Sequence, residues 1–384
     1  MTRGTRTRTA LAAALALAVV TGPAVPAFAA VPSVAAVPAS ALDTAALRQA
    51  IADLPAADAT AAIVRVGGRD GTWRGVSGVH DIATGRKAIA DGRFRAGSVT
   101  KVFTASVVLQ LVAEHRVALD RPVQDYLPGL FPADRPSITV AQLLNHTSGI
   151  QPADTPGGTF ADWYANRFAS YTPQAMVASA AARPLEFTPG TAQHYLNINY
   201  TVLGLLIEKI TGTSYEHQVQ RRILTPLHLR DTYFPGDDPR ILGPHNLGYQ
   251  TTDSGLVDVT DWNVTGSWAA GDIISSAADL ERFTTALFGG RVVPKSQFQH
   301  MLQVPDGIDG AAYTMGMSRM VLPDGTVAYG KSGERWGYST LIGATLDADG
   351  RIDRTLVFSV DSTDAKSETG NPRTLPIILA ALEG

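Results

Sequence analysis

The sequence predicts an α+β fold in which one antiparallel sheet is built from both termini and is flanked by helices. Two strand-like runs, 61–66 and 72–79, come early in the chain, and further strand-like runs return after residue 312. Between them, residues 119–261 carry helices and irregular loops dense in Pro, Asp and Gly. At 384 residues the chain exceeds the usual size of one hydrophobic core, which favours an inserted, mainly helical lobe.

The first 29 residues have the three regions of a secretory signal peptide. A stretch with three arginines precedes an apolar run over 10–20 and then Ala27-Phe28-Ala29, so cleavage is expected after Ala29. The apolar run is too short to span a bilayer comfortably, and no later segment reaches 18 uninterrupted apolar residues. We therefore expect a secreted or cell-envelope protein with no integral membrane segment after cleavage, and residues 30–41 as a tether.

Composition narrows the function classes. Hydrophobic residues make up 45% and charged residues 17% of the chain, as in an ordinary globular protein. The formal net charge is −3, and removal of the three leader arginines leaves −6, which argues against nucleic acid or an anionic membrane as a partner. The chain has no cysteine, so disulfides, thiol chemistry and cysteine-based metal sites are excluded.

The remaining elements follow in a regular order. Helical spacing over 42–54 precedes the first two strands, and the long apolar run 102–112 indicates a buried helix. Ser276 is placed to cap one later helix. Helices are predicted at 140–144, 173–182, 200–210, 275–287 and 377–382, and strands at 313–321, 326–330, 340–346 and 355–360. The sheet lobe would then take about 42–110 and 265–384, and the helical lobe about 111–264.

Ser98 and Lys101 form a Ser-x-x-Lys pair at the head of the run 102–112. Residues three apart on a helix share a face, so the hydroxyl and the amine can meet. A serine becomes a nucleophile when a neighbouring base takes its proton, and burial lowers a lysine pKa towards that task. The backbone N–H of Ser98 at a helix start can be one donor of an oxyanion site. Such a pair also occurs by chance on solvated surfaces, so other motifs must support it.

Two further motifs carry suitable groups. Tyr195-x-Asn197, ahead of the helix 200–210, can place a phenol for proton transfer and a carboxamide for a substrate amide in a cleft. The same residues also fit a tyrosine packed on a helix start. Lys331-Ser332-Gly333 follows the strand 326–330 and offers a cation, a hydroxyl and backbone groups to an extended substrate. Lys331 is informative because the chain has only six lysines.

A formal phosphate-binding loop overlaps the third motif, since Gly325-x-x-x-x-Gly330-Lys331-Ser332 matches its pattern. We reject this interpretation because the intervening residues are strand formers and Gly333 and Gly337 break any following helix. The histidines lack the spacing of a zinc protease, and the chain has no Gly-x-Ser-x-Gly elbow.

The three motifs, in this order, resemble the active-site set of the penicillin-recognising serine hydrolases. Their form resembles the branch that contains class C β-lactamases and secreted D-alanyl-D-alanine carboxypeptidases. The resemblance covers about residues 45–360 and includes Phe94–Ser98, Leu143–Gly149, Asn199-Tyr200 with Leu203-Gly204, Ser267–Gly271 and Gly337-Tyr338. It implies a β-lactamase/transpeptidase-like fold and neither a metal nor an organic cofactor.

The resemblance implies four catalytic residues. Ser98 would be the acylated nucleophile and Lys101 its proton partner. Tyr195 would act as general base or acid, and Lys331 would lie near its oxygen and keep its pKa low.

The resemblance also implies a substrate-binding set. Asn197 would bind the substrate amide, Trp268 would line the cleft, and the backbone N–H of Glu334 would be the second oxyanion donor. Ser332 and Gly333 of the third motif would complete the set.

Three positions depart from the family pattern. Leu196 stands where serine is common, and Glu334 follows the third motif. Ser318 stands where the carboxypeptidases have an arginine, with Arg319 next. A carboxylate at Glu334 is expected to repel a terminal carboxylate of the substrate, unless Arg335 neutralises it or it points to solvent.

The expected function is an exported acyl-serine hydrolase of the D-alanyl-D-alanine carboxypeptidase type. Its substrate would be a small peptide, an ester or a β-lactam, and the protein would be a monomer. A β-lactamase, a carboxylesterase and a D-amino-acid peptidase remain open within the same fold. A penicillin-binding sensor that acylates without turnover is the non-enzyme alternative.

Overall fold

The structure is a computed structural model that describes residues 42–383. The predicted signal peptide (1–29) and tether (30–41) lie outside the described residues. Among the helices of the described part, none is long and apolar enough to cross a membrane.

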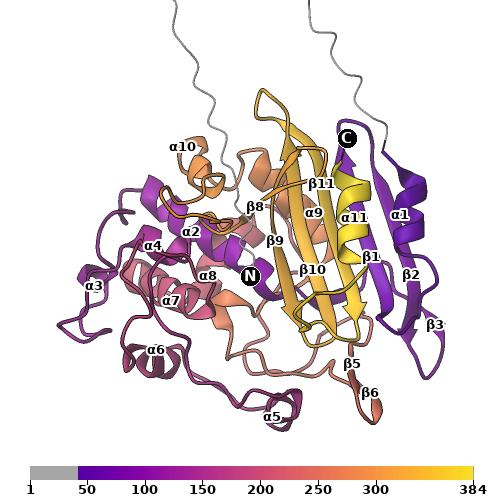
Figure 1. The fold of residues 1–384 in the computed structure, drawn as a ribbon, viewed down its shortest axis with the longest axis horizontal. Coiled ribbons are helices and arrows are strands. Elements are labelled where there is room, and N and C mark those ends of the chain that lie inside the picture. Colours follow the sequence, from indigo (N-terminus) through magenta and orange to yellow (C-terminus); the bar gives the residue numbers. More distant parts are fainter. Residues whose placement is uncertain (1–41, 384) are drawn as a thin grey trace, which may run out of the picture. The chain divides into compact units, whose positions relative to one another are not determined.

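A seven-stranded antiparallel sheet forms one side of the described residues, the right-hand half of Figure 1, with the helices α3 to α8 on the other side. Its order is β3-β2-β1-β11-β10-β9-β8. The two ends of the chain meet where β1 pairs with β11, with Val64 opposite Phe358. This arrangement confirms the predicted fold class. The strands are β1 Ala59–Gly68, β2 Trp73–Asp81, β3 Arg86–Lys87, β8 Ser318–Val321, β9 Val327–Arg335, β10 Tyr338–Leu346 and β11 Ile352–Ser362.

Helices cover both faces of this sheet. The helices α1 (Thr44–Ala50) and α11 (Thr374–Leu382) lie on one face and α9 (Ala277–Phe288) on the other (Figure 1). Successive residues of β10 point to opposite faces: Leu341 belongs to the apolar cluster of Ile377, whereas Ile342 belongs to that of Phe283. Because both faces are covered, the central strands are apolar almost throughout.

The segment between β4 (Arg93–Arg95) and β7 (Ile274–Ser276) is mainly helical. Helix α2 (Thr100–Ala113) runs through its core with every residue from 100 to 109 buried. This burial on all sides explains why the apolar residues of α2 are spread around the helix instead of forming a one-sided pattern. The other α-helices of this segment are α3 Val123–Tyr126, α4 Val140–Leu144, α5 Phe160–Ala165, α6 Pro173–Ala181, α7 Asn197–Thr211 and α8 Tyr215–Val219. The segment also contains the hairpin of β5 Tyr249–Thr252 and β6 Gly255–Asp258, and α10 (Lys295–Phe298) follows α9 later in the chain.

Two element boundaries differ from the prediction at the motifs. Ser98 lies in a 3₁₀ turn, Gly97–Val99, that leads into α2. The strand β9 continues through Arg335, because 331–335 stay paired with β10, so the third motif lies inside a strand. That strand also confirms the rejection of the phosphate-binding loop.

Two other element boundaries near the site also differ from the prediction. Helix α7 begins at Asn197, three residues before its predicted start, because Leu196 is the last extended residue. The strand β8 begins only at Ser318, because 313–317 turn back, with Thr314 N–H bonded to the Met317 carbonyl at 2.9 Å.

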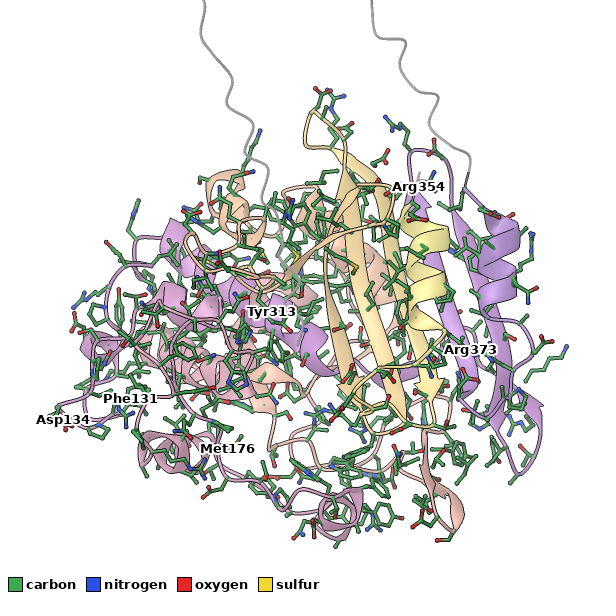
Figure 2. All side chains as sticks on the ribbon, viewed as in Figure 1. Phe131, Asp134, Met176, Tyr313, Arg354 and Arg373 are labelled. Atoms are coloured by element: carbon green, nitrogen blue, oxygen red, sulfur yellow. The ribbon has the colours of Figure 1, made fainter. Side chains whose placement is uncertain are left out.

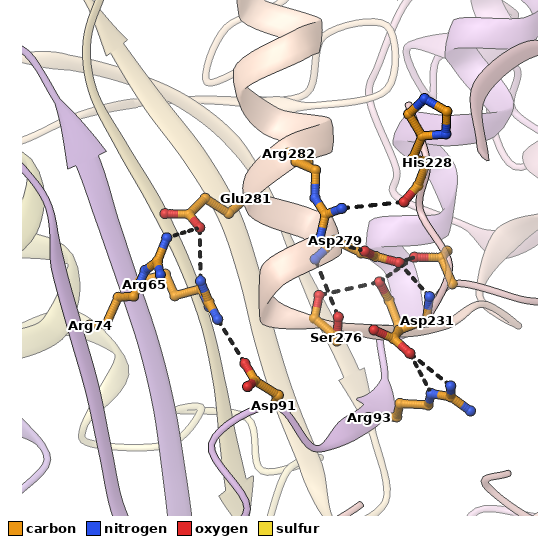
Figure 3. Close-up of polar contacts among 12 residues, drawn as sticks. Arg65, Arg74, Asp91, Arg93, His228, Asp231, Ser276, Asp279, Glu281 and Arg282 are labelled. Carbon is orange, nitrogen blue, oxygen red and sulfur yellow. Dashed lines mark hydrogen bonds and ion pairs between the residues drawn. The ribbon is translucent and has the colours of Figure 1, made fainter. Parts of the chain in front are cut away.

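Polar contacts fix α9 against the sheet and against the strand before Ser98 (Figure 3). Glu281 Oε2 accepts a bond from Arg65 of β1 at 2.9 Å. Ser276 Oγ accepts the Asp279 N–H at 3.2 Å, which confirms the predicted cap. Since Ser276 also ends β7, which pairs with β4, these contacts help to position the chain that enters the Ser98 turn.

Candidate active site

The Lys101 side chain is fully buried beside Ser98. Its Nζ lies 3.1 Å from Ser98 Oγ, 2.7 Å from Asn197 Oδ1 and 2.7 Å from the Ala270 carbonyl oxygen. Burial, followed by the positive charges of Lys331 and Arg335, holds the pKa of Lys101 well below its ordinary value of 10.5. Two motifs that are 96 residues apart in the chain therefore meet at one amine.

These partners decide what a neutral Lys101 can do. A neutral amine has two N–H donors and one lone pair. The Ala270 carbonyl and the Asn197 carboxamide oxygen only accept, and both are at the shorter distance. These two oxygens accept hydrogen bonds from the two N–H groups of the neutral amine, so its lone pair faces Ser98 Oγ. This geometry suits a neutral Lys101 to accept the proton of the serine hydroxyl.

The Tyr195 phenol lies over the same amine. Its ring centroid is 4.9 Å from Lys101 Nζ and 4.7 Å from Lys331 Nζ. Burial raises the pKa of Tyr195, and the nearby Ser98 hydroxyl only partly offsets this rise. The expectation that Lys331 keeps this pKa low is therefore wrong, because loss of solvent outweighs the neighbouring cations. The phenol is protonated at neutral pH and is suited to donate a proton.

Two further aromatic rings hold Tyr195 in place. The rings of His146 and Tyr313 lie 4.5 Å and 4.9 Å from it, centroid to centroid. Tyr313 lies near the centre of the molecule in Figure 2. The Gln193 side chain fixes the loop that carries Tyr313. It accepts hydrogen bonds from the backbone N–H groups of Ala312 and Tyr313 and donates one to the Tyr313 carbonyl. Burial lowers the pKa of His146 well below 6.5, so this ring adds no charge.

A cluster of cations surrounds the site. Lys331 is only 5% exposed, and burial lowers its pKa to about 8. Arg335 donates from Nε and an η-nitrogen to the Gly271 carbonyl at 3.1 Å and 2.9 Å. Lys366, from the β11–α11 connection, donates to the Glu334 carbonyl at 3.2 Å. Prediction from the sequence identified Lys331 and named Arg335 only as a possible partner of Glu334, and it missed Lys366, although Lys366 is one of only six lysines.

Two glycines bring the backbone of β9 against the Ser98 turn. A Cβ atom on Gly333 would lie 2.0 Å from the Ala96 carbonyl oxygen and 3.0 Å from the Ser98 amide nitrogen. A Cβ atom on Gly97, whose φ is +52°, would lie 2.7 Å from the Glu334 amide nitrogen. The amide nitrogens of Ser98 and Glu334 therefore converge where only glycine fits, as an oxyanion site requires.

The structure places two of the expected binding residues elsewhere. Trp268 is 9% exposed, donates its Nε1–H to Glu216 at 2.6 Å and packs on Tyr215, so it belongs to the core and not to the cleft wall. Ser332 lies opposite Leu341 of β10, on the face that α11 covers. Because strand residues alternate, its side chain points away from the face of Lys331.

Glu334 is also placed differently from the expectation of direct repulsion. Its side chain is 42% exposed, and its Oε2 lies 3.8 Å from Lys366 Nζ. The neutralising cation is thus Lys366 and not Arg335, whose described hydrogen bonds go to Gly271. The carboxylate is partly solvated and partly paired, so it does not dominate the charge of the site.

A cavity of about 460 Å³ opens next to Asn197. Apolar side chains form most of its wall, including Phe160 and Trp163 of α5 and Trp336 of the β9–β10 turn. Met176 of α6, labelled in Figure 2, also contributes. Arg335 and Lys366 lie at its polar end. Sequence patterns gave no sign of this cavity, because its wall comes from six separate segments, 152–163, 171–176, 196–198, 266–267, 335–336 and 366. No group of His, Asp or Glu within residues 42–383 could hold a metal ion.

Comparisons with known proteins agree with this arrangement. The β-lactamase family model matches residues 47–382. A solved D-stereospecific amidohydrolase from Streptomyces sp. superposes with a TM-score of 0.75 at 32% identity, covering 88% of this chain and 98% of that one.

Two curated relatives match more locally. Penicillin-binding protein 4 of Amycolatopsis lactamdurans is 32% identical over 223 residues, which is 57% of this chain and 56% of that protein. Esterase EstB of Burkholderia gladioli is 32% identical over 186 residues, 46% of this chain and 47% of that protein. The chain thus spans about half the length of these curated relatives.

Proposed function

The chain belongs to the β-lactamase family, and we propose that it is a serine acyl hydrolase that cleaves amide or ester bonds of D-amino-acid derivatives through an acyl-enzyme on Ser98. The observation that carries this proposal is the buried Lys101 amine, whose Nζ lies 3.1 Å from Ser98 Oγ and 2.7 Å from each of two neutral oxygen acceptors. The similarity to a D-stereospecific amidohydrolase over nearly that enzyme's whole length supports the choice of D-configured substrates. The leader over residues 1–29 and a monomeric state belong to the same proposal.

Acylation would return Lys101 and Tyr195 to their starting protonation states. Ser98 Oγ attacks the substrate carbonyl carbon while its proton passes to Lys101 Nζ. The carbonyl oxygen, now an anion, accepts hydrogen bonds from the amide N–H groups of Ser98 and Glu334. As the C–N or C–O bond breaks, the leaving atom takes the Tyr195 proton, and the phenolate recovers a proton from the Lys101 ammonium. Asn197 holds Lys101 and borders the substrate cavity.

Deacylation would repeat the sequence with water. Water attacks the ester carbonyl carbon and gives its proton to the Lys101 amine, because the Tyr195 phenol is already protonated. The Ser98–acyl bond breaks, Ser98 Oγ takes the proton back, and the free acid leaves. No other group has to change its charge over the full cycle.

D-alanyl-D-alanine carboxypeptidase activity is the second candidate. Lys331 favours it, because its ammonium lies beside Tyr195, where a leaving D-alanine carboxylate would come to rest. The partial pairing of Glu334 with Lys366 removes much of the repulsion expected from the sequence.

Labelling with a fluorophosphonate, read by intact-mass spectrometry, tests the nucleophile. One adduct is expected in the wild type and none in Ser98→Ala, with Ser332→Ala as a control that retains it. Turnover of D- and L-phenylalanine amide, of a D-alanyl-D-alanine peptide and of a p-nitrophenyl ester then sorts the substrates. An adduct that persists in Ser98→Ala, or equal rates for the two enantiomers, overturns the proposal.

A further inference from the structure

The 460 Å³ cavity beside Asn197 lies at one defined end of the site. Along β9, Lys331 comes first, the Gly333–Glu334 contact with the Ser98 turn follows, and Arg335 leads to Trp336. Each strand residue advances about 3.3 Å, so Lys331 and Trp336 are roughly 16 Å apart. Arg335 and Trp336 line the cavity, whereas Lys331 and Tyr195 do not.

This order fixes which part of a substrate can enter the cavity. The leaving group must take a proton from Tyr195, and that phenol lies beside Lys331. The leaving group therefore occupies the Lys331 end. The acyl part extends in the opposite direction from the reacting carbonyl, past Asn197 and towards Trp336. We call this cavity the acyl pocket.

The wall of the acyl pocket suits a bulky apolar group. Phe160 meets Trp336 edge to face at 4.9 Å between ring centroids, and Trp262 supports Trp336 at 5.9 Å. Helix α5 has no buried residue, so Phe160 and Trp163 cover the pocket and do not belong to the core. A methyl side chain would fill a small part of 460 Å³, whereas an aromatic side chain can contact both α5 and Trp336.

The charges around the acyl pocket disfavour an ammonium group there. Arg335 and Lys366 line it. Among the described residues of its wall, Asp154 is the one acid, and Arg183 pairs with it. Glu334 shares its carboxylate with Lys366. A free α-ammonium on the acyl residue would meet cations and no free carboxylate.

We propose that the acyl pocket binds a bulky apolar acyl group whose amino group is blocked, as in an N-acylated D-amino acid or an internal peptide residue. This inference rests on the proposed function for the direction of the substrate. It separates the chain from an aminopeptidase-type enzyme, which must hold a free ammonium. Trp336 and Phe160 set the size preference, and Lys366 sets the charge preference.

Three methyl esters with the same leaving group test the proposal. We expect kcat/KM for N-acetyl-D-phenylalanine methyl ester to exceed that for N-acetyl-D-alanine methyl ester and for D-phenylalanine methyl ester at least tenfold each. Trp336→Ala and, separately, Phe160→Ala should lower the first value at least tenfold and leave the N-acetyl-D-alanine value within about twofold. Lys366→Glu should raise the relative rate of the free amine. Phe168→Ala, an exposed aromatic outside the pocket, is the matched control.

Direct binding separates this inference from the proposed function. In the Ser98→Ala background, calorimetry with N-acetyl-D-phenylalanine methyl ester should show binding that Trp336→Ala weakens at least tenfold. Equal binding in both proteins, or a wild type that prefers the alanine or the free-amine ester, overturns the acyl pocket. If the wild type turns over none of the three esters, while Trp336→Ala still weakens binding in the Ser98→Ala background, the acyl pocket stands and the proposed catalytic role fails.

Discussion

Lys101 is surrounded by groups that accept hydrogen bonds but carry no negative charge. The Ala270 carbonyl and Asn197 Oδ1 fix its amine without stabilising an ammonium as a carboxylate would. Burial then favours the neutral form. Packing around this lysine therefore suits it to the role of base that we propose for it.

We predict that both Lys101→Ala and Lys101→Arg lose acylation by about 10²–10⁴-fold. Alanine removes the base, and arginine keeps a cation that cannot give up its proton near neutral pH. The rate of Ser98 labelling by a fluorophosphonate, followed by time-resolved mass spectrometry, measures the effect. Wild-type labelling in Lys101→Arg would show that position 101 contributes charge alone.

Tyr195→Phe should separate the two halves of the reaction. Its phenol is protonated, so the leaving group of an amide depends on it, whereas the weakly basic leaving group of a p-nitrophenyl ester does not. We predict that the variant still acquires the Ser98 adduct from the activated ester and releases it about 10²–10⁴-fold more slowly. Burst amplitude and steady-state rate give both numbers, and Tyr126→Phe is a tyrosine control elsewhere. A lost burst would place the phenol in the attack step.

The charge of Lys331 predicts the alkaline arm of the pH profile. Burial lowers its pKa to about 8, so the ammonium is present below pH 8 and lost above it. If this cation orients the leaving group, kcat/KM falls as pH rises through about 8. Lys331→Arg keeps its charge over this range and should move the falling arm to higher pH. An unchanged alkaline arm in that variant would assign it to another group.

At the scale of elements, the contact between β9 and the Ser98 turn decides the geometry of the site. The carbonyls of Ala96 and Gly333 lie 3.0 Å and 3.1 Å from the Thr340 hydroxyl, which holds the two segments together. A strand and a 3₁₀ turn can approach this closely only where a side chain is missing.

Gly333→Ala is therefore expected to reduce kcat about 10²–10³-fold, the range for loss of one oxyanion donor. Its methyl group would overlap the Ala96 carbonyl and push the amides of Ser98 and Glu334 apart. Gly343→Ala of β10 is the control, since a Cβ there meets its nearest atoms at an ordinary contact distance of 3.4 Å, on the side of Leu382 and away from the Ser98 turn. Thermal unfolding checks that both variants fold, and a fully active Gly333→Ala would remove β9 from the oxyanion site.

The sequence predicted the elements that local patterns determine. Apolar runs and turn residues predicted α2, α4, α6 and the central strands, and a capping residue predicted the start of α9. The meeting of Ser98 with Lys101 followed from a three-residue spacing. The side of the sheet on which Ser332 lies, and the burial of Trp268, depend on register and on distant partners, which no local pattern carries.

The acyl pocket was beyond sequence reasoning for the same reason. Phe160, Trp163 and Trp336 come from segments more than 170 residues apart and meet only after the sheet and the helical lobe have folded. Without that fold, an aromatic in a Pro- and Gly-rich loop indicates nothing about a substrate.

At the scale of the whole molecule, the sheet depends on contacts between the two ends of the described chain. Arg373, labelled in Figure 2, lies just before α11 and donates to both carboxylate oxygens of Asp58, at 2.6 Å and 3.1 Å. It also donates to the Ala52 carbonyl at 2.8 Å. These bonds fasten the C-terminal helix to the segment that joins α1 to β1.

Arg373→Ala should therefore destabilise the molecule without changing its chemistry. The two side chains are 16% and 26% exposed, so the carboxylate of Asp58 would lose a charge-assisted, bidentate partner in partly desolvated surroundings. We predict a loss of about 2–4 kcal/mol in the free energy of unfolding, measured by urea titration, with kcat/KM at 25 °C within twofold of the wild type. Arg373→Lys should recover only part of the loss, because an ammonium cannot make the paired contact.

Arg351→Ala, which breaks a well-exposed pair with Asp349, is the control and should leave the midpoint of urea unfolding unchanged. Equal midpoints for Arg373→Ala and Arg351→Ala would mean that the apolar contacts of α11 alone hold the two ends together.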